Sequence, residues 1–326
     1  MSQLMFSIEV DGKNYSILLP DWKTDYIQGM LAEKAVPYEL AMLEAMSGAL
    51  DSEDLILDVG ANIGNHTLYL AAIVGCRVVA FEPNPILASP LQESIVVNGL
   101  ENRVSLIPKG VGAAEARGVF AESKPDNLGA QSLTLVSDPD QVSDKRNILE
   151  VISLDSMTFD RPVKVIKIDV EGMELDVLEG AKDLIEKDKP SLFIESHNTE
   201  QFMLIHNFLE KWGYVYWRTF NATPTNWFIP SNVAVQFDLQ KHGLEQGKTF
   251  YKLWDERQRL RKSLVELREK YRLANESLVD LQSRLDDFEM IANKEERESK
   301  PNFDTRFIIQ PEQALGLDFS LPEDRR

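Results

Sequence analysis

The stretch "LILDVGANIGNHTLYLAAIVGCRVVAFEPNP", residues 55–85, decides the fold. An apolar run reaches Asp58 and a glycine-rich turn, a segment with helical spacing follows, and a second apolar run ends at Glu82. Strand, turn, helix and strand in this order predict a parallel βαβ unit, whose strands end at the same edge of a sheet. We therefore ask which ligand needs a carboxylate at each of two neighbouring strand ends.

A dinucleotide is the usual ligand of such a turn, because backbone amides at a helix N-terminus bind its pyrophosphate. Here Asp58 would repel a phosphate, and Asn62 stands where the dinucleotide motif has a glycine. S-adenosylmethionine fits better. Asp58 can bind its ammonium directly or through water, Glu82 can accept both ribose hydroxyls, and Gly60 and Gly64 permit close approach of the backbone. The residues therefore favour an S-adenosylmethionine site.

Further apolar runs at residues 104–107, 163–168 and 191–195 predict the other strands of the sheet. Nearly continuous apolar strands that alternate with helices are typical of a parallel sheet covered on both faces. Ligands of such sheets bind beyond the carboxyl ends of the strands. The polar segment 114–150 is expected to pass over this ligand side.

The N-terminal region has two patterns of its own. Residues 5–19 alternate between apolar and polar around Asp11-Gly12, which is the turn pair of a two-residue β-hairpin. Residues 28–50 have helical apolar spacing, and Pro37 is expected to divide this region into two helices.

Composition and charge exclude several classes of protein. The 326 residues, 43% of them hydrophobic, suffice for a globular domain and an appendage. A net charge of −18 argues against a nucleic-acid substrate, since phosphate binding needs clustered Lys and Arg. The single cysteine, Cys76, lies in an apolar stretch and is expected to be a buried structural thiol in a reducing compartment. Without a signal pattern or a long apolar run, we expect a cytoplasmic protein with no membrane span.

Five motifs resemble the FkbM family of class I S-adenosylmethionine-dependent methyltransferases. They are "LDVGANIGNHTLYLA" (57–71), "VVAFEPNP" (78–85), "VISLDSM" (151–157), "VIKIDVEGMELDVLEGA" (165–181) and "LFIESH" (192–197). The resemblance, which covers about residues 37–220, implies a Rossmann-like α/β fold with a seven-stranded, mostly parallel sheet. It also implies methylation of a hydroxyl oxygen on a sugar, glycan or polyketide. By similarity, the cofactor site comprises Asp58, Gly60, Asn62, Gly64, Thr67, Glu82 and Asn84.

Methyl transfer to a hydroxyl needs an aligned oxygen and a base that removes its proton. Asp169 and Glu171 follow one predicted strand, and Glu195 and His197 end another, so these side chains should converge. We expect His197 or Glu171 to be the general base and Asp169 to shape the rim of the site. Mg²⁺ or Ca²⁺ held by the three acids is an alternative that we do not favour, because no spacing motif specifies it. Lys167, inside an apolar strand, is expected to pair with a neighbouring acid.

From Phe250 onward, apolar residues keep a four-three spacing through five heptads, which is typical of a coiled coil. With Phe250 at position a, leucines fall at most d positions, which suits a parallel dimer. In that register Glu256 faces Arg261 of the partner, and Arg284 faces Glu289, so both pairs attract. The alternative is a long helix that folds back on its own domain.

These patterns divide the chain into an N-terminal hairpin and helical region (1–50), a methyltransferase domain (51–249), a coiled coil (250–299) and a tail (300–326). We predict an S-adenosylmethionine-dependent O-methyltransferase that acts on a hydroxyl of a saccharide, glycan or glycolipid and forms homo-oligomers through the coiled coil. Three alternatives remain: a degenerate domain that serves as a scaffold, a methyltransferase for a polyketide-type small molecule, and an NAD-dependent dehydrogenase. Asn62 argues against the last.

Overall fold

The computed structural model describes residues 4–48, 50–120, 131, 133–136, 148–221, 223–233 and 237–298. Its contacts divide the chain into two compact units, Met1–Gln258 and Arg259–Arg326. The helix α8 (Phe237–Glu298) begins in the first unit and continues in the second. The expected tail, residues 300–326, lies outside the described residues.

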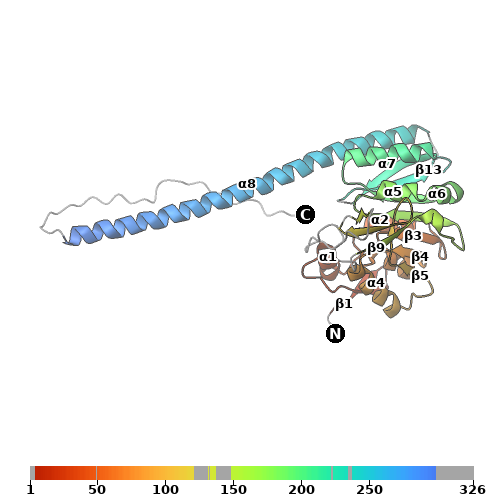
Figure 1. Cartoon of the computed structure of the whole chain (residues 1–326), viewed down its shortest axis with the longest axis horizontal. Coiled ribbons are helices and arrows are strands. Elements are labelled where there is room, and N and C mark those ends of the chain that lie inside the picture. The colour runs from red at the N-terminus through yellow and green to blue at the C-terminus, as the bar shows by residue number, and fades with distance from the viewer. Residues whose placement is uncertain are drawn as a thin grey trace. The chain divides into compact units, whose positions relative to one another are not determined.

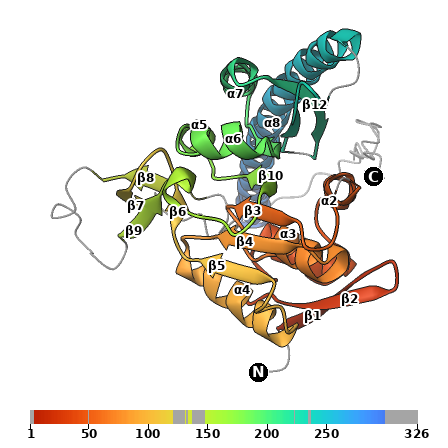
Figure 2. The same cartoon turned by 90° about the vertical axis from the view of Figure 1, so that its right-hand side faces the viewer.

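A seven-stranded sheet with the strand order β12-β13-β11-β10-β3-β4-β5 forms the centre of the first unit (Figures 1 and 2). Its strands are β3 (Leu55–Val59), β4 (Arg77–Phe81), β5 (Val104–Ile107), β10 (Val163–Ile168), β11 (Ser191–Glu195), β12 (Tyr214–Phe220) and β13 (Thr225–Pro230). β13 runs antiparallel to both of its neighbours, and the other neighbouring pairs are parallel. The first five strands lie where the apolar runs predict them.

Alternation along the strands directs side chains into two cores. Leu55, Leu57 and Val59 of β3 belong to one core, and Ile56 belongs to the other. The first core is covered by α5 (Glu174–Glu179), α6 (Lys182–Asp188) and α7 (Thr199–Lys211). The second is covered by α3 (Asn65–Leu68), the π-helical segment η1 (Tyr69–Val74) and α4 (Pro85–Val97). Figure 2 shows these two groups of helices on opposite sides of the sheet.

The N-terminal region packs onto the second core. β1 (Met5–Val10) and β2 (Lys13–Leu18) form the predicted hairpin, and both turn residues, Asp11 and Gly12, have positive φ. The backbone N–H of Leu18 donates to Ser94 Oγ of α4 at 2.9 Å. As expected, Pro37 lies between two helices, α1 (Tyr26–Lys34) and α2 (Leu40–Ser47).

A second sheet, of the order β6-β9-β7-β8, follows β5 and lies to one side of the first sheet in Figure 2. Its strands are β6 (Gly110–Val111), β7 (Ala116–Phe120), β8 (Leu133–Leu135) and β9 (Leu149–Ile152), and the short 3₁₀-helix η4 (Leu154–Ser156) follows them. Within the predicted polar excursion, residues 121–130, 132 and 137–147 lie outside the described residues.

α8 begins at Phe237, before the start of the predicted heptads, and Tyr251 fixes it to the first unit. The Tyr251 ring is fully buried and stacks on Phe202, with 4.7 Å between the ring centroids. Its hydroxyl accepts a hydrogen bond from Asn226 Nδ2 at 2.7 Å and makes a further one with Ser196.

Two further expectations concern Cys76 and the membrane. Cys76 is buried, and this burial raises the pKa of its thiol to about 12, as expected of a structural cysteine. Among the described helices, none combines the length and the apolar character that a membrane span needs.

Candidate active site

A buried ion pair lies beneath the carboxyl end of the sheet. Lys167 of β10 and Asp58 of β3 are neighbours in register, with 3.3 Å between Lys167 Nζ and Asp58 Oδ1. Lys167 Nζ also lies 3.4 Å from Asp169 Oδ2 and donates to the carbonyl oxygen of Gly60 at 2.6 Å. Burial alone would lower the pKa of Lys167, but the charges of Asp169 and Asp58 raise it overall. The predicted pairing of Lys167 with a neighbouring acid is confirmed.

Asp58 does not reach a cavity wall among the described residues. Its side chain is fully buried, and its Oδ2 accepts a hydrogen bond from Thr67 Oγ1 at 2.6 Å. The cause is strand alternation: Leu57 and Val59 face one core, so Asp58 points to the opposite face, which α3 covers. Asp58 and Thr67 therefore hold Lys167 under the glycine turn. Binding of a ligand by Asp58, directly or through water, stays a prediction, although Asp58 is not among the residues that line the two pockets described below.

The glycine turn brings the ends of β3 and β10 into close contact. Gly60 has a φ of +81°, and a Cβ there would lie 1.8 Å from the carbonyl oxygen of Asp169. Gly64 has a φ of +94°, and its Cβ would lie 2.2 Å from Leu91 Cδ1. Both positions thus need glycine for their backbone conformation and for space. Asn62 also has a positive φ, and its Oδ1 accepts from the backbone N–H of Ile63 at 2.6 Å.

Glu82 lies directly after β4, as predicted, and each of its carboxylate oxygens accepts one backbone hydrogen bond. The donors are the N–H groups of Asn62 and Asn84, both at 2.8 Å. Burial raises the pKa of Glu82 to about 7, although both hydrogen bonds oppose the shift. Asn84 caps α4, because its Oδ1 accepts from Ile86 N at 3.0 Å. Glu82 therefore fixes two loops and still has lone pairs for a ligand.

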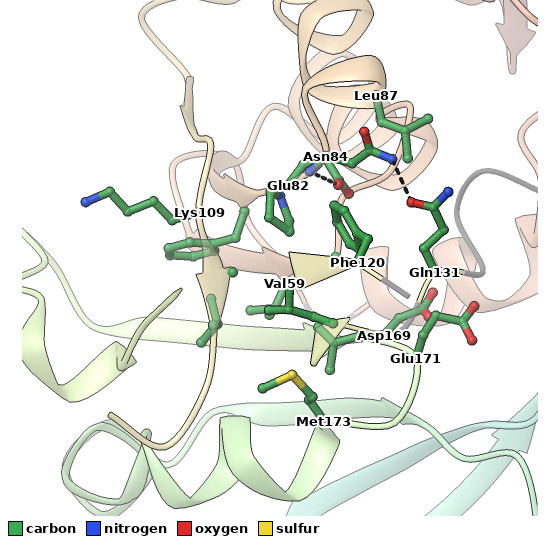
Figure 3. A pocket seen from close by; sticks show the side chains of 17 residues that line it. Val59, Glu82, Asn84, Leu87, Lys109, Phe120, Gln131, Asp169, Glu171 and Met173 are labelled. Carbon is green, nitrogen blue, oxygen red and sulfur yellow. Dashed lines mark hydrogen bonds between the residues drawn. The ribbon is translucent and has the colours of Figure 1, made fainter. Parts of the chain in front are cut away.

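Two pockets meet at this edge of the sheet, and we name them by their walls. The apolar pocket lies between the two sheets, and its hydrophobic wall consists of Val59, Phe81, Pro83, Leu87, Val111, Phe120, Leu133, Val170 and Met173. Figure 3 shows Glu82, Asn84 and Leu87 on one side of it and Asp169, Glu171 and Met173 on the other. The described part of the polar excursion thus forms a wall on the ligand side, as expected.

The acidic pocket, of about 250 Å³, lies next to α1, α2 and α3. Its charged and titratable lining residues are Tyr26, Tyr38, Glu39, His66, Glu82, Lys167, Asp169, Glu171 and Glu195. Gly60, Glu82, Asp169 and Glu171 line both pockets. The two pockets therefore adjoin at the glycine turn.

The predicted catalytic residues converge at the edge of the acidic pocket. His197 Nε2 lies 3.4 Å from Glu171 Oε2 and 3.4 Å from Glu195 Oε2. Burial and the charge of Asp169 raise the pKa of Glu195 well above its usual range. Burial also opposes ionisation of Asp169, but Lys167 outweighs it and lowers the pKa of Asp169. The two neighbouring acids therefore differ in acidity: Glu195 holds its proton more tightly than an ordinary glutamate, and Asp169 less tightly than an ordinary aspartate.

The comparisons with known proteins agree with the sequence motifs. Residues 58–216 match the family model described as the methyltransferase FkbM domain. The chain carries an FkbM methyltransferase domain. The hexuronic acid methyltransferase AglP of Haloferax volcanii is 30% identical over 139 residues, which are 42% of this chain and 53% of AglP. The chain thus spans about half the length of this curated relative.

Two solved structures resemble the FkbM domain more distantly. A methyltransferase FkbM from Methylobacillus flagellatus KT is 21% identical, with a TM-score of 0.43, and the match covers 64% of this chain and 58% of that one. The TYW2 protein of M. jannaschii, in complex with AdoMet, is 12% identical, with a TM-score of 0.36, and the match covers 70% of this chain and 85% of that one.

Sequence reasoning missed a hydrogen-bonded pair in the wall of the acidic pocket. Glu39 Oε2 lies 3.1 Å from His66 Nε2, and both side chains are largely buried. Glu39 lies before the residues that match the FkbM domain, on a segment that Asn65 of α3 holds in place. The Asn65 side chain accepts from the backbone N–H of Tyr38 and donates to its carbonyl oxygen, both at 2.9 Å. Asn65 and His66 stand in the quoted motif, but nothing in it indicates that they reach residues 38 and 39.

A second network fixes the loop that carries His197. Glu174 is fully buried, and its Oε1 accepts from Gly172 N at 3.0 Å. The Gln201 side chain donates to Glu174 through Nε2 and accepts from the backbone N–H of His197 at 2.8 Å. Burial raises the pKa of Glu174. The "VEGMELD" motif contains Glu174, but only the fold reveals its partner on α7.

One set of side chains in the FkbM domain has the composition of a metal site. Glu171, Glu195 and His197 offer ligand atoms that all lie within 4.8 Å of one another. Carboxylate oxygens and an imidazole nitrogen suit several divalent cations. The set differs from the predicted one, which had Asp169 in place of His197.

Proposed function

We propose that the chain is an S-adenosylmethionine-dependent O-methyltransferase whose acceptor is a hydroxyl of a saccharide, glycan or glycolipid. The observation that carries this proposal is Glu82, a buried carboxylate shared by an apolar pocket and an acidic pocket. The FkbM domain supports methyl transfer. The saccharide acceptor is supported by the relative AglP, which is named for a hexuronic acid.

The residues around the glycine turn fit S-adenosylmethionine. Leu87, Phe120 and Leu133 offer apolar surface for a purine, and Glu82 has free lone pairs for a ribose diol. The acidic pocket suits a cationic amino-acid end, which Glu39, rather than the buried Asp58, would bind. When bound, this cofactor supplies a methyl group on a positively charged sulfur.

His197 would accept the hydroxyl proton through Nε2. Glu171, 3.4 Å from that nitrogen, stabilises the imidazolium that results. Asp169, whose pKa is lowered, offers an acceptor for a second hydroxyl of the acceptor sugar, and Glu195, whose pKa is raised, offers a donor in its protonated form. A base in this position contributes about 10²- to 10⁴-fold to the rate, and correct placement of the hydroxyl contributes more.

The decisive experiment supplies isotopically labelled S-adenosylmethionine together with separate preparations of uronic acid-containing glycans, neutral glycans and glycolipids. We expect label in a saccharide, and we expect it to survive mild alkali, because a methyl ether is stable where a methyl ester of a uronic acid is hydrolysed. Alkali-labile label would contradict transfer to a hydroxyl. Calorimetry that detects no binding at millimolar S-adenosylmethionine would leave the scaffold alternative.

The role of Glu39 has its own test. Glu39→Gln removes the charge that would face the cofactor's ammonium, whereas Glu44→Gln changes an exposed glutamate on the same helical segment. We expect S-adenosylmethionine to bind the first variant about ten times more weakly and the second normally, since a charged hydrogen bond contributes about 1.5–3 kcal/mol. Equal affinities for the two variants would remove Glu39 from the cofactor site.

The cluster of Glu171, Glu195 and His197 favours one variant of this mechanism, in which a divalent cation lowers the pKa of the acceptor hydroxyl. Turnover that persists after exhaustive chelation would exclude it. Turnover that is lost on chelation and restored by Mg²⁺ or Mn²⁺ would make His197 a ligand rather than the base.

A further inference from the structure

The part of α8 in the second unit exposes a regular row of leucines. The row consists of Leu260, Leu264, Leu267, Leu278, Leu281 and Leu285, whose exposed fractions lie between 47% and 65%. Tyr271, 68% exposed, stands at the heptad position between the two groups. All seven occupy a and d positions when Phe250 is placed at a. Contiguous exposed apolar surface of this kind marks an interaction site.

The polar face of the same helix contains ion pairs between its own side chains. Arg272, at position b, pairs with Glu269 and Glu276, both at position f. The Arg272 Nη2–Glu269 Oε1 distance is 2.6 Å. Arg272 thus finds its partners within the helix, whereas the leucines make no contact that buries them among the described residues. Within the part of the chain that the structure describes, this row has no apolar partner of the same length and period.

We infer that this row binds the same row of a second copy of the chain, in a parallel, two-stranded coiled coil. The inference does not rest on the proposed methyl transfer. A two-fold axis along the pair brings each leucine opposite its own counterpart, so the surface is complementary to itself. Arg257 at one a position favours two strands, because a charged side chain there is tolerated only near solvent. Glu256 at g faces Arg261 at e of the partner helix, twice by symmetry, and this attraction favours the parallel orientation.

Light scattering on the full chain tests the association. We expect twice the mass of one chain, and a single-chain mass at every concentration up to about 100 µM would overturn the inference. Leu264→Glu combined with Leu278→Glu should give the mass of one chain, with unchanged thermal unfolding of the first unit, because both leucines are exposed in the second unit.

The matched control uses the neighbouring b positions. Val265→Glu combined with Val279→Glu changes two exposed apolar residues that have the same separation as the two leucines but lie outside the row. We expect this variant to keep twice the mass of one chain. If both double variants dissociate alike, the association does not use the a and d positions and the inference fails.

Cysteine cross-linking tests the orientation. The natural thiol, Cys76, is buried, so it should not cross-link and any covalent dimer would come from the introduced cysteine. Leu267→Cys should give a covalent dimer on mild oxidation, because a parallel pair brings this d position opposite itself. Lys262→Cys, at the outward f position, should not. A dimer in which the 267 position fails to cross-link would overturn the parallel register.

Discussion

The apolar pocket and the acidic pocket share Gly60, Glu82, Asp169 and Glu171, but their remaining walls differ in kind. One is closed by hydrophobic side chains from two sheets, and its lysine, Lys109, points away from the labelled carboxylates in Figure 3. The other is lined by carboxylates around one buried ammonium. The four shared residues, which we call the junction, thus lie between an apolar wall and a charged wall. The apolar wall suits a ligand by its shape, and the charged wall suits one by its charge.

The pKa values of the acids shared by or next to the two pockets shift in opposite directions, because Lys167 outweighs the effect of burial at one of them. Glu82 and Glu195 have raised pKa values because they are removed from water, whereas Asp169 keeps its charge because Lys167 lies 3.4 Å away. Substitutions in each pocket should therefore affect different measurements, and they are ordered below by the size of the expected effect.

The largest effect should come from the edge of the acidic pocket. His197→Gln is expected to lower kcat about 10²- to 10⁴-fold while S-adenosylmethionine affinity stays unchanged, since the side chain would act on the acceptor alone. Steady-state kinetics and calorimetry separate the two quantities. Near-normal turnover in both His197→Gln and Glu171→Gln would show that neither side chain is the base.

Removal of the buried ammonium should cost stability rather than turnover alone. Lys167→Met leaves Asp58 and Asp169 without their cation, and we expect the free energy of unfolding to fall by about 3–5 kcal/mol. Lys164→Met, at an exposed position of the same strand, should change it by less than about 0.5 kcal/mol. Urea unfolding measures both. Similar losses of unfolding free energy in the two variants would mean that the buried ion pairs of Lys167 do not stabilise this edge of the sheet.

Substitution in the glycine turn should lower stability by a smaller amount, and a second glycine at positive φ serves as the control. Gly60→Ala and Gly12→Ala both place a Cβ at positive φ, but only at residue 60 does it meet backbone, 1.8 Å away. At Gly12 nothing lies within 4 Å. We expect Gly60→Ala to be less stable than Gly12→Ala by about 1–3 kcal/mol and to bind S-adenosylmethionine more weakly. Equal unfolding midpoints would contradict the close contact between the ends of β3 and β10.

The ionisation of Glu82 should mainly affect how the free energy of unfolding depends on pH. Its pKa is about 7 in the folded chain against an ordinary 4.5, so the folded chain holds a proton that the unfolded chain has lost between these values. This contribution is fully present below pH 4.5 and is lost as the pH rises through 7. Glu195 acts in the same direction. We therefore expect Glu82→Gln to flatten the decline without abolishing it, and an unchanged slope would reject the raised pKa.

The sheet was predictable from the sequence because its strands are buried on both faces. Residues 163–168 are apolar except for two lysines: Lys164 is exposed, and Lys167 is buried against an acidic partner. The hairpin was equally clear, because Asp11-Gly12 suits a turn with positive φ at both positions. The strands and the hairpin depend on the residues within each segment, so a single sequence was enough to predict them.

The site was only partly predictable, because its walls come from distant segments. The convergence of His197 with Glu171 follows from strand ends, but the burial of Asp58 depends on which face of β3 it occupies. That face could have been read from the apolar neighbours Leu57 and Val59. The approach of Glu39 to His66 depends on how α2 packs on α3, and no spacing in the sequence specifies it.

Tyr251 has a practical consequence for where the catalytic part of the chain can be cut. The match to the FkbM domain ends at residue 216, yet the Tyr251 hydroxyl closes a hydrogen-bond triangle with Asn226 and Ser196, the residue between Glu195 and His197. A fragment trimmed after β13 would leave a hole beside Phe202 and remove the hydrogen bond between the Tyr251 and Ser196 hydroxyls. The start of the long helix thus stabilises the residue that precedes His197, the proposed proton acceptor.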